Sequence, residues 1–373
     1  MSAWEAVAFG TTAKNSKDRE KFWKAWQHYT SKCGTDPFLS RCSPQSKDLI
    51  TCAFAAWIRS GAIGRGRQIR VQGVTDALGA VAKTFQLAGQ PSPIHRSDDR
   101  YTVMIERLTE GFRRQDPPAT PQLAVPVTVP NLVFNTGKKF GTPKEEAIGC
   151  LTLIAFYYLL RVGEYTQPRY VKRNGKTVRA TRTVQFTIRN VGFFKNGKVV
   201  PRTAPLATLL SCDAATLKIT NQKNGRMGDT VHHEAISPAI PECPVKALAL
   251  RVFHVLSNNG TDDSLLCAYA NDNAKWHSIT SKDIVTAVRT ATTTLKLQDQ
   301  AIDPDLVGAH SLRAGGATAL KLAGASDIEI KKYGRWSSLT FTQYIHTQIA
   351  HLSAGVSSKM SKVLPFVNIA AFD

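Results

Sequence analysis

Acidic residues are scarce in this chain. There are 28 Asp and Glu against 48 Lys and Arg, which gives the 373 residues a formal net charge of +20. Such an excess is typical of proteins that bind polyanions, and nucleic acid is the leading candidate partner. Hydrophobic residues make up 43% of the sequence and charged residues 20%, which excludes an extended, highly charged chain and predicts a globular one.

Long apolar runs and paired cysteines are also missing. No stretch approaches the roughly 18 consecutive apolar residues of a membrane helix, and no basic start followed by an apolar segment indicates a signal peptide. The seven cysteines include no Cys-x-x-Cys pair and no close Cys/His cluster of zinc-finger type. The sequence therefore predicts an intracellular protein with reduced thiols and no membrane span.

The length predicts two domains, and the first should be helical. Apolar residues recur at helical spacing from Phe22, and further helices are predicted at 46–59, where Ser46 would cap the start, 68–87 and 98–114. The prolines between Asp116 and Pro121 interrupt this pattern. We expect an N-terminal extension at 1–15, a helical domain at 16–116 and a linker at 117–130.

The second predicted domain, 131–350, is mainly helical with a small antiparallel sheet, an α+β fold. A helix capped by Thr142 should run to Leu160 and deliver Arg161 at its end. Alternating residues at 183–189 and 216–221 predict strands, and His232-His233-Glu234 is assigned to the returning strand because it lacks the histidine spacing of a zinc hydrolase. Further helices are predicted at 245–256, 281–295, 311–322, 327–333 and 339–349, and 351–373 forms a tail.

Basic side chains are concentrated early in the second domain. Residues 161–230 contain 14 Lys and Arg against three acidic residues, a net charge of +11. This segment is expected to follow a nucleic-acid backbone and to make binding strongly salt-dependent.

The motif with the clearest chemistry is GAHSLRAGGAT at 308–318. It places His310 and Arg313 three residues apart at the start of a helix, where both can face one target. An imidazole can transfer a proton near neutral pH, and a guanidinium can hold two phosphate oxygens at once. Taken alone, the motif favours a structural interpretation, in which His310 caps the helix or packs and Arg313 pairs with a carboxylate.

Two flanking motifs give this segment a context. Upstream, LLRVGE at 159–164 contains Arg161 and Glu164; downstream, YGRWSSLTFTQYIH at 333–346 ends in a helix that presents Tyr344. In this order the motifs resemble those of the tyrosine recombinase (phage integrase) family, and their wording is most similar to recombinases of eukaryotic Crypton-type mobile elements. The resemblance covers about residues 140–350 and implies a C-shaped clamp of a core-binding and a catalytic domain around duplex DNA.

The resemblance implies a role for each matching residue. Arg161 and Arg313 would hold the scissile phosphate, and Tyr344 would attack it to form a 3′-phosphotyrosyl link, with the two arginines and His310 as candidates to assist loss of its proton. Lys223, in the turn at 222–225, would be the general acid for the leaving 5′-oxygen; an exposed turn lysine is the alternative.

Two assignments at the implied site have competitors. Trp336 is preferred over Arg335 for the family's His/Trp position, although it precedes Tyr344 by eight residues where nine is commoner. Glu164 would support the site from behind, or form a salt bridge at a helix end.

The remaining expectations concern partners. The predicted DNA-contacting residues are Arg169, Lys172, Arg173, Arg226 and Arg335. The resemblance implies that no metal, ATP or other cofactor is needed. It also implies a homotetramer on DNA, formed by a protein that is monomeric alone, with the 351–373 tail exchanged between protomers. Residence in the nucleus follows if the mobile-element assignment holds. The alternatives are a type IB topoisomerase or telomere resolvase, and a non-catalytic DNA-binding protein derived from a recombinase.

Overall fold

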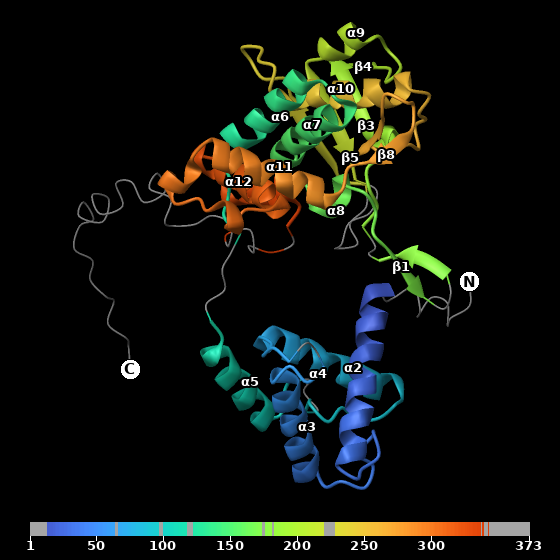
Figure 1. Cartoon of the computed structure of the whole chain (residues 1–373), viewed down its shortest axis with the longest axis vertical. Coiled ribbons are helices and arrows are strands. Elements are labelled where there is room, and N and C mark those ends of the chain that lie inside the picture. The colour runs from blue at the N-terminus through green and yellow to red at the C-terminus, as the bar shows by residue number, and fades with distance from the viewer. Residues whose placement is uncertain are drawn as a thin grey trace, which may run out of the picture. The chain divides into compact units, whose positions relative to one another are not determined.

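The structure, a computed structural model, describes residues 13–63, 66–96, 100–117, 122–173, 176–180, 183–219, 228–336, 338 and 342. It is mainly helical with small antiparallel sheets, so the predicted fold class is confirmed (Figure 1). The chain divides into two compact units, Met1–Thr120 with Arg169–Thr181, and Pro121–Pro168 with Arg182–Asp373. The clamp arrangement of the two units stays a prediction.

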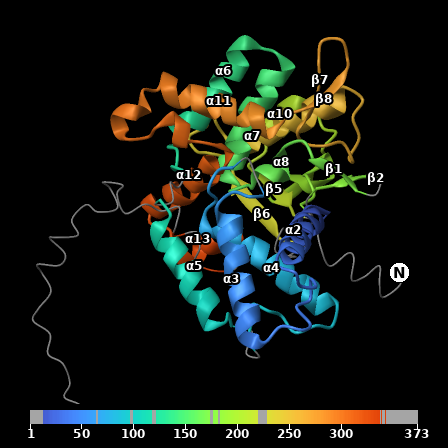
Figure 2. The ribbon, with the colours of Figure 1, turned by 60° about the horizontal axis from the view of Figure 1, so that its bottom comes forward.

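The first unit consists of helices and a hairpin (Figure 2). Its elements are α2 (Ala13–Lys32), α3 (Pro44–Arg59), α4 (Val71–Leu87), α5 (Val103–Gln115), β1 (Tyr170–Arg173) and β2 (Lys176–Arg179). The helices share one apolar core, in which Trp26 is fully buried, meets Phe54 edge to face and donates from its indole nitrogen to the carbonyl oxygen of Pro37 at 2.7 Å. Burying such large aromatic surfaces is the main stabilising contribution in a helical unit of this size.

Two predicted helix starts in this unit are wrong. Ser43, and not Ser46, caps α3: its hydroxyl accepts a hydrogen bond from the Ser46 amide at 3.2 Å, because Pro44 already occupies the first helical turn. Helix α5 begins at Val103 after the cap position Thr102, five residues later than predicted.

The second unit contains a four-stranded sheet and helices. In chain order its helices are α6 (Thr128–Phe140), α7 (Pro143–Tyr157), α8 (Val162–Tyr165), α9 (Leu206–Leu210), α10 (Pro244–Ser257), α11 (Ser281–Thr294), α12 (Ala309–Leu322) and α13 (Asp327–Gly334). Its strands are β3 (Val191–Lys195), β4 (Lys198–Val200), β5 (Ala214–Lys218), β6 (Thr230–Glu234), β7 (Ala268–Ala270) and β8 (Trp276–Ser278).

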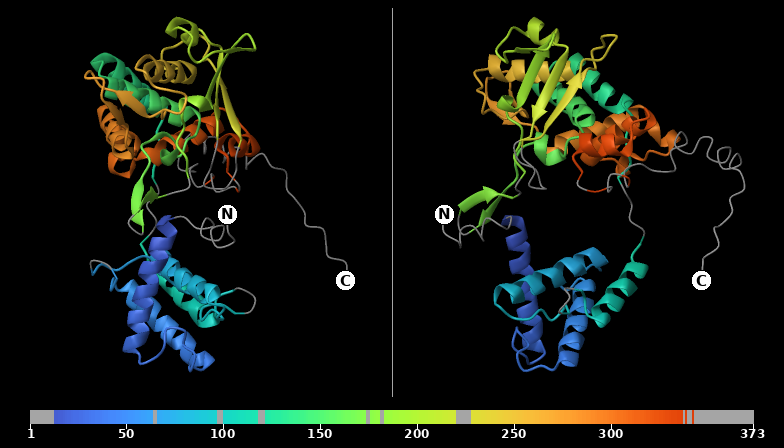
Figure 3. Two further views of the ribbon diagram at one scale, coloured as in Figure 1. Left: turned by 90° about the vertical axis from the view of Figure 1, so that its right-hand side faces the viewer. Right: turned by 180° about the vertical axis from the view of Figure 1, so that it is seen from behind.

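The sheet is antiparallel throughout, in the order β4-β3-β5-β6. Its central register pairs Val191 with Leu217 and Leu217 with Val231, and all three side chains are buried in the core. Helices α7 and α10 lie on one face of this sheet (Figure 3). A half-buried sheet against two apolar helices explains the alternating sequence of its strands.

Helix α7 is the central element of the second unit. Its N-cap Thr142 accepts a hydrogen bond from the Glu145 amide at 3.3 Å, as the sequence predicts. Helix α6 packs closely along α7 because Gly149 has no side chain: a Cβ there would lie 2.8 Å from the Cα of Phe134. The sequence analysis did not predict α6: residues 128–130 fall in the expected linker, and the first helix expected in the second domain is the one capped by Thr142. Pro130 and the neighbouring β-branched residues hide the periodicity of α6.

The predicted strand at 183–189 is wrong. Its amides and carbonyls pair with scattered partners: the Phe186 amide donates to Glu164 and the Ile188 amide to Ser264, at 2.8 and 3.0 Å. Phe186 and Ile188 are buried as in a strand. The alternation of apolar residues therefore indicates which side chains are buried, and does not indicate regular hydrogen bonding to a neighbouring strand. None of the described helices is long and apolar enough to cross a membrane.

Helix α12 approaches α7 through a pair of glycines. A Cβ on Gly315 would lie 2.1 Å from the carbonyl oxygen of Val125, and one on Gly316 would lie 2.3 Å from that of Phe156. Both neighbours are backbone atoms and cannot rotate away. The glycine pair in the 308–318 motif is therefore a packing requirement of the fold.

We expect Gly316→Ala to destabilise the second unit by about 2 kcal/mol or more, because the added methyl forces α12 away from α7. Gly79→Ala is the control: it lies in α4 with nothing within 4 Å of its Cβ, and should raise stability by roughly 0.5–1 kcal/mol. Urea unfolding measures both. Equal effects of the two substitutions would contradict this packing explanation.

Candidate active site

The site is built on the turn that ends α7. The Leu160 amide donates to the carbonyl oxygen of Ala155 at 3.0 Å and the Leu159 amide to that of Phe156 at 3.4 Å, which is the pattern of a Schellman cap. Leu159 has a φ of 49°, a left-handed conformation that glycine usually occupies and that costs a leucine about 1 kcal/mol. The Leu159 side chain is fully buried beside Ala317 and Trp336, and this burial offsets the strain.

The carbonyl oxygen of Leu159 is a shared acceptor for two arginines. Arg313 donates to it from Nη1, and Arg335 donates from Nη2 at 3.0 Å. Arg313 and Arg335 are each only 2% exposed, so these guanidinium groups are held inside the protein. The turn after α7 thus positions residues that lie more than 150 positions later in the chain.

Three contacts fix the orientation of Arg313. Besides the bond to Leu159, its Nη2 donates to the carbonyl oxygen of Gly334, and its guanidinium lies 4.3 Å from the ring centroid of Trp336. A planar guanidinium held by two carbonyls and an aromatic face presents its edge in one direction only. The Trp336 ring folds back over Gly334, where any Cβ would lie 1.5 Å from a ring carbon.

Glu164 joins Arg161 to Arg335. Its carboxylate is 1% exposed; Oε2 accepts from the Arg161 amide at 2.8 Å, and Oε1 lies 3.3 Å from Arg161 Nη1. Arg335 Nη2 lies 3.2 Å from Oε2. Burial lowers the pKa of Arg335, while the neighbouring Glu164 carboxylate acts to raise it. A carboxylate shared between two guanidiniums holds both of them in place.

The contacts described so far join three guanidinium groups in one network. Those of Arg161 and Arg335 share the Glu164 carboxylate, and that of Arg313 shares the Leu159 carbonyl oxygen with Arg335. Charges inside a protein are screened much less than charges in water. An arrangement with more cationic than anionic groups at close range is suited to receiving an anion. The geometry therefore favours a phosphate or comparable anion as the ligand of this region.

His310 stands at the start of α12, three residues before Arg313. The helix begins after Gly308, whose amide donates to the Ser311 hydroxyl at 3.0 Å. His310 is exposed, whereas Arg313 is buried. The N-terminus of a helix favours negative charge, which adds to the effect of the arginines.

A histidine and a tyrosine brace the same region from the sheet. His233 of β6 hydrogen-bonds through Nε2 with the carbonyl oxygen of Tyr157 at 2.9 Å, and its ring lies 5.6 Å from that of Tyr333 on α13. The Tyr333 hydroxyl donates to the carbonyl oxygen of His232 at 3.4 Å. Burial lowers the pKa of His233 to about 4, so it is neutral at physiological pH. Its place in the returning strand agrees with the sequence prediction.

The structure brings most of the described predicted residues together. Arg161, Glu164, Arg313, Arg335 and Trp336 form one connected cluster, with His310 on the same helix as Arg313. Arg335 was expected to contact DNA, but its side chain is buried and forms an ion pair with Glu164. Their roles in catalysis stay predictions.

Other predicted residues lie elsewhere. Arg169 and Lys172 are exposed at the β1–β2 hairpin of the first unit. Lys223, Arg226 and Tyr344 lie outside the described residues, as does the side chain of Arg173. Within the described part of the chain, no group of three or more His, Cys, Asp or Glu is placed to hold a metal ion.

Sequence reasoning missed Leu159 and the bracing pair His233 and Tyr333. No local sequence pattern predicts that a leucine adopts a left-handed conformation. The one available signal was the YGRW motif, in which Gly334 is required because the indole of Trp336 covers it.

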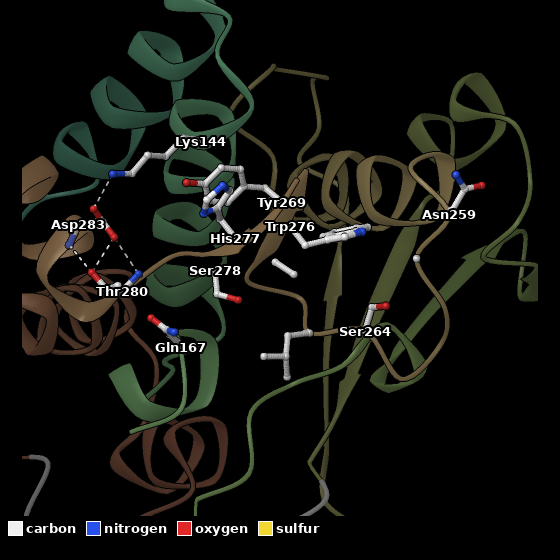
Figure 4. Close-up of a pocket in the computed structure, with 13 residues that line it drawn as sticks. Lys144, Gln167, Asn259, Ser264, Tyr269, Trp276, His277, Ser278, Thr280 and Asp283 are labelled. Carbon is white, nitrogen blue, oxygen red and sulfur yellow. Dashed lines mark hydrogen bonds and ion pairs between the residues drawn. The ribbon is translucent and has the colours of Figure 1, made fainter. Parts of the chain in front are cut away.

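A large cavity of the second unit is separate from this cluster. It measures about 690 Å³ and lies beside the β7–β8 hairpin, with Trp276, Tyr269 and His277 on one side and the ion pair of Lys144 with Asp283 on the other (Figure 4). None of the predicted site residues lines it. We therefore place the candidate active site at the arginine cluster and not in this cavity.

No model of a known protein family matches the chain, and no curated protein matches it. Solved structures similar to it include the XerH site-specific recombinase bound to a palindromic difH substrate, with 12% identity, 84% of this chain and 72% of that chain covered, and a TM-score of 0.46. XerA recombinase is 13% identical, with 93% of this chain and 100% of that chain covered and a TM-score of 0.37. The Tn1549 transposon integrase in complex with circular intermediate DNA is 11% identical, with 92% of this chain and 99% of that chain covered and a TM-score of 0.43. Since every TM-score is below 0.5, these similarities assign no function by themselves.

The cluster makes a prediction about stability. Glu164→Gln leaves the buried guanidinium of Arg335 and the partly exposed one of Arg161 without the carboxylate that they share, and should destabilise the second unit by roughly 3 kcal/mol. Arg335→Met removes one of those charges, so the double variant should be less destabilised than the sum of the single variants. Urea unfolding of all four proteins completes the cycle, and additive effects would show that the two residues do not interact.

A second prediction concerns pH. The pKa of His233 falls from 6.5 to about 4 on folding, and that of His254 falls likewise, so the unfolded chain binds more protons between those pH values. Stability should therefore decrease as the pH is lowered from 6.5 to 4, by up to about 1.4 kcal/mol per pH unit for each histidine. His233→Gln should make this decrease shallower, whereas His277→Gln, at an exposed site, should not. Urea unfolding at several pH values measures the slopes.

Proposed function

We propose that this protein is a site-specific DNA recombinase that cleaves and rejoins DNA strands through a tyrosine. The observation that carries the proposal is the meeting of Arg161 and Arg313 at the end of α7, through contacts with Leu159, Arg335 and Glu164. A phosphodiester undergoing attack gathers negative charge on its non-bridging oxygens, and preorganised guanidiniums stabilise that charge.

The proposed reaction balances without an external energy source. The Tyr344 hydroxyl oxygen forms a bond to phosphorus while the bond from phosphorus to the 5′-oxygen breaks. The phenol has an ordinary pKa of about 10, so its proton must be accepted during attack, for which His310 is the candidate. Lys223 gives a proton to the leaving 5′-oxygen. The 3′-phosphotyrosyl bond keeps the energy of the original link, and rejoining reverses these steps.

The partners we propose follow from charge and from the motifs. The net charge of +20 supports duplex DNA as the substrate. Exposed Arg169 and Lys172 are suited to backbone contacts. Action as a tetramer on DNA, the Crypton-type mobile-element origin and residence in the nucleus rest on the motif wording and belong to this proposal.

The experiment that tests the proposal uses nicked suicide duplexes carrying candidate element termini, without added metal. The wild-type protein should form a protein–DNA adduct that survives SDS, whereas Tyr344→Phe should bind the same DNA and form none, because it lacks only the attacking oxygen. An adduct from Tyr344→Phe would mean that another residue is the nucleophile. Tight binding to a verified terminus with no adduct from either protein would favour a non-catalytic DNA-binding protein.

The same assay tests the arginine cluster. Arg313→Ala should reduce adduct formation by about 100-fold or more through loss of phosphate stabilisation. Because Arg313 also supports the fold, its thermal unfolding and DNA binding should be recorded beside those of Arg161→Ala, whose side chain is more exposed. Full activity of both variants in folded form would contradict the phosphate-binding role.

A further inference from the structure

A second cationic site lies in the second unit, beside the first half of α7. Arg251 on α10 is 1% exposed; its Nε donates to the carbonyl oxygen of Leu266 at 3.3 Å and its Nη2 to that of Ala268. Within the described part of the chain, no carboxylate lies within ion-pair distance of Arg251, and its Nη1 has no hydrogen-bond partner. A buried guanidinium without an anionic partner is unfavourable unless something else compensates its charge.

Arg251 lines a cavity of about 270 Å³ between α6, α7, α9 and α10. Lys138 on α6 lines it too, with its ammonium 5.2 Å from the ring centroid of Phe134. The apolar part of the lining comes from Phe134, Leu206, Leu250 and Phe253. The cavity is slightly smaller than typical drug-sized ligand sites, which begin at about 300 Å³.

Three other titratable groups face this cavity, and one of them, the Cys150 thiol, stays neutral because burial raises its pKa to about 12. His254 accepts a hydrogen bond through Nε2 from the Ala270 amide at 3.2 Å, and burial beside Arg251 lowers its pKa to about 4, so it adds no charge at neutral pH. Glu146 is the one acidic side chain in the lining, and burial raises its pKa. It makes no ion pair with Lys138 or Arg251, so the two cations are not neutralised by direct contact.

We infer that this cavity binds a small organic monocarboxylate with an apolar body. Arg251 and Lys138 would hold the carboxylate, and the phenylalanine and leucine side chains would cover the apolar part. Guanidinium groups bind carboxylates through charge-assisted hydrogen bonds, and a dry apolar wall strengthens them. The inference does not depend on the recombinase proposal.

Three probes of similar chemistry separate the contributions. Benzoate has both the charge and the apolar ring, benzamide keeps the ring without the charge, and acetate keeps the charge without the ring. Calorimetry and ligand-observed NMR on the full-length protein without DNA should detect benzoate binding that is at least about tenfold tighter than that of either comparator. Equal binding of benzoate and benzamide would overturn the assignment of a carboxylate site.

Substitutions place the binding in this cavity. Lys138→Ala should weaken benzoate binding about tenfold, whereas Lys139→Ala, at the exposed neighbouring position outside the cavity, should leave it unchanged. Glu146→Gln removes the one negative charge and should tighten binding by roughly threefold. If Lys138→Ala and Lys139→Ala behave alike, the carboxylate binds elsewhere.

A steric variant covers the case in which substitution of buried Arg251 prevents folding. Ser257 lies exposed at the cavity lining, at the last position of α10. Ser257→Trp should fill the cavity and abolish benzoate binding, and Ser257→Ala should retain it. Benzoate binding to correctly folded Ser257→Trp would overturn the proposal. Because no DNA is present, the result is separate from the test of Tyr344.

Discussion

The hydrogen bonds to the carbonyl oxygen of Leu159 are the constraint on which the candidate site depends. That oxygen is available because α7 ends in a left-handed turn, which directs it away from the helix axis. Arg313 and Arg335 then meet there, although they lie on either side of α13 in the sequence. The carbonyl joins the C-terminal helices to the central helix of the second unit, so a change in that turn would displace both guanidiniums together.

The sequence predicts which residues gather at the site better than it predicts what supports them. The arginines, the histidine and the tryptophan stand in motifs, and the structure places Arg161, Arg313 and Trp336 in one connected cluster. The burial of Arg335 against Glu164 could not be predicted, because tertiary packing decides whether an arginine lies at the surface or inside the protein. Leu159 carries no signal at all, since a left-handed leucine contradicts local preference.

The fold shows the same division. Long helices with clear caps, such as α7 and α11, were predicted nearly to their ends. Helix α6 was not predicted, because Pro130 interrupts its pattern. The hairpins β1–β2 and β7–β8 were not predicted either, because their strands are too short to show an alternation of apolar and polar residues. The alternation at 183–189 identified buried side chains correctly, but burial alone does not distinguish a ladder from an irregular segment pinned to Glu164 and Ser264.

Local rules are broken together in one place. Among the described non-glycine residues with positive φ, Leu39, Leu159 and Arg335 are buried, and the last two touch the same ion cluster. There, two guanidiniums also share one buried carboxylate, that of Glu164. Each departure costs stability, and each persists only because the surrounding packing leaves no alternative. A fold under selection for stability alone would replace these buried charges with apolar side chains. Their concentration at the end of α7 is therefore what a site built to receive an anion requires.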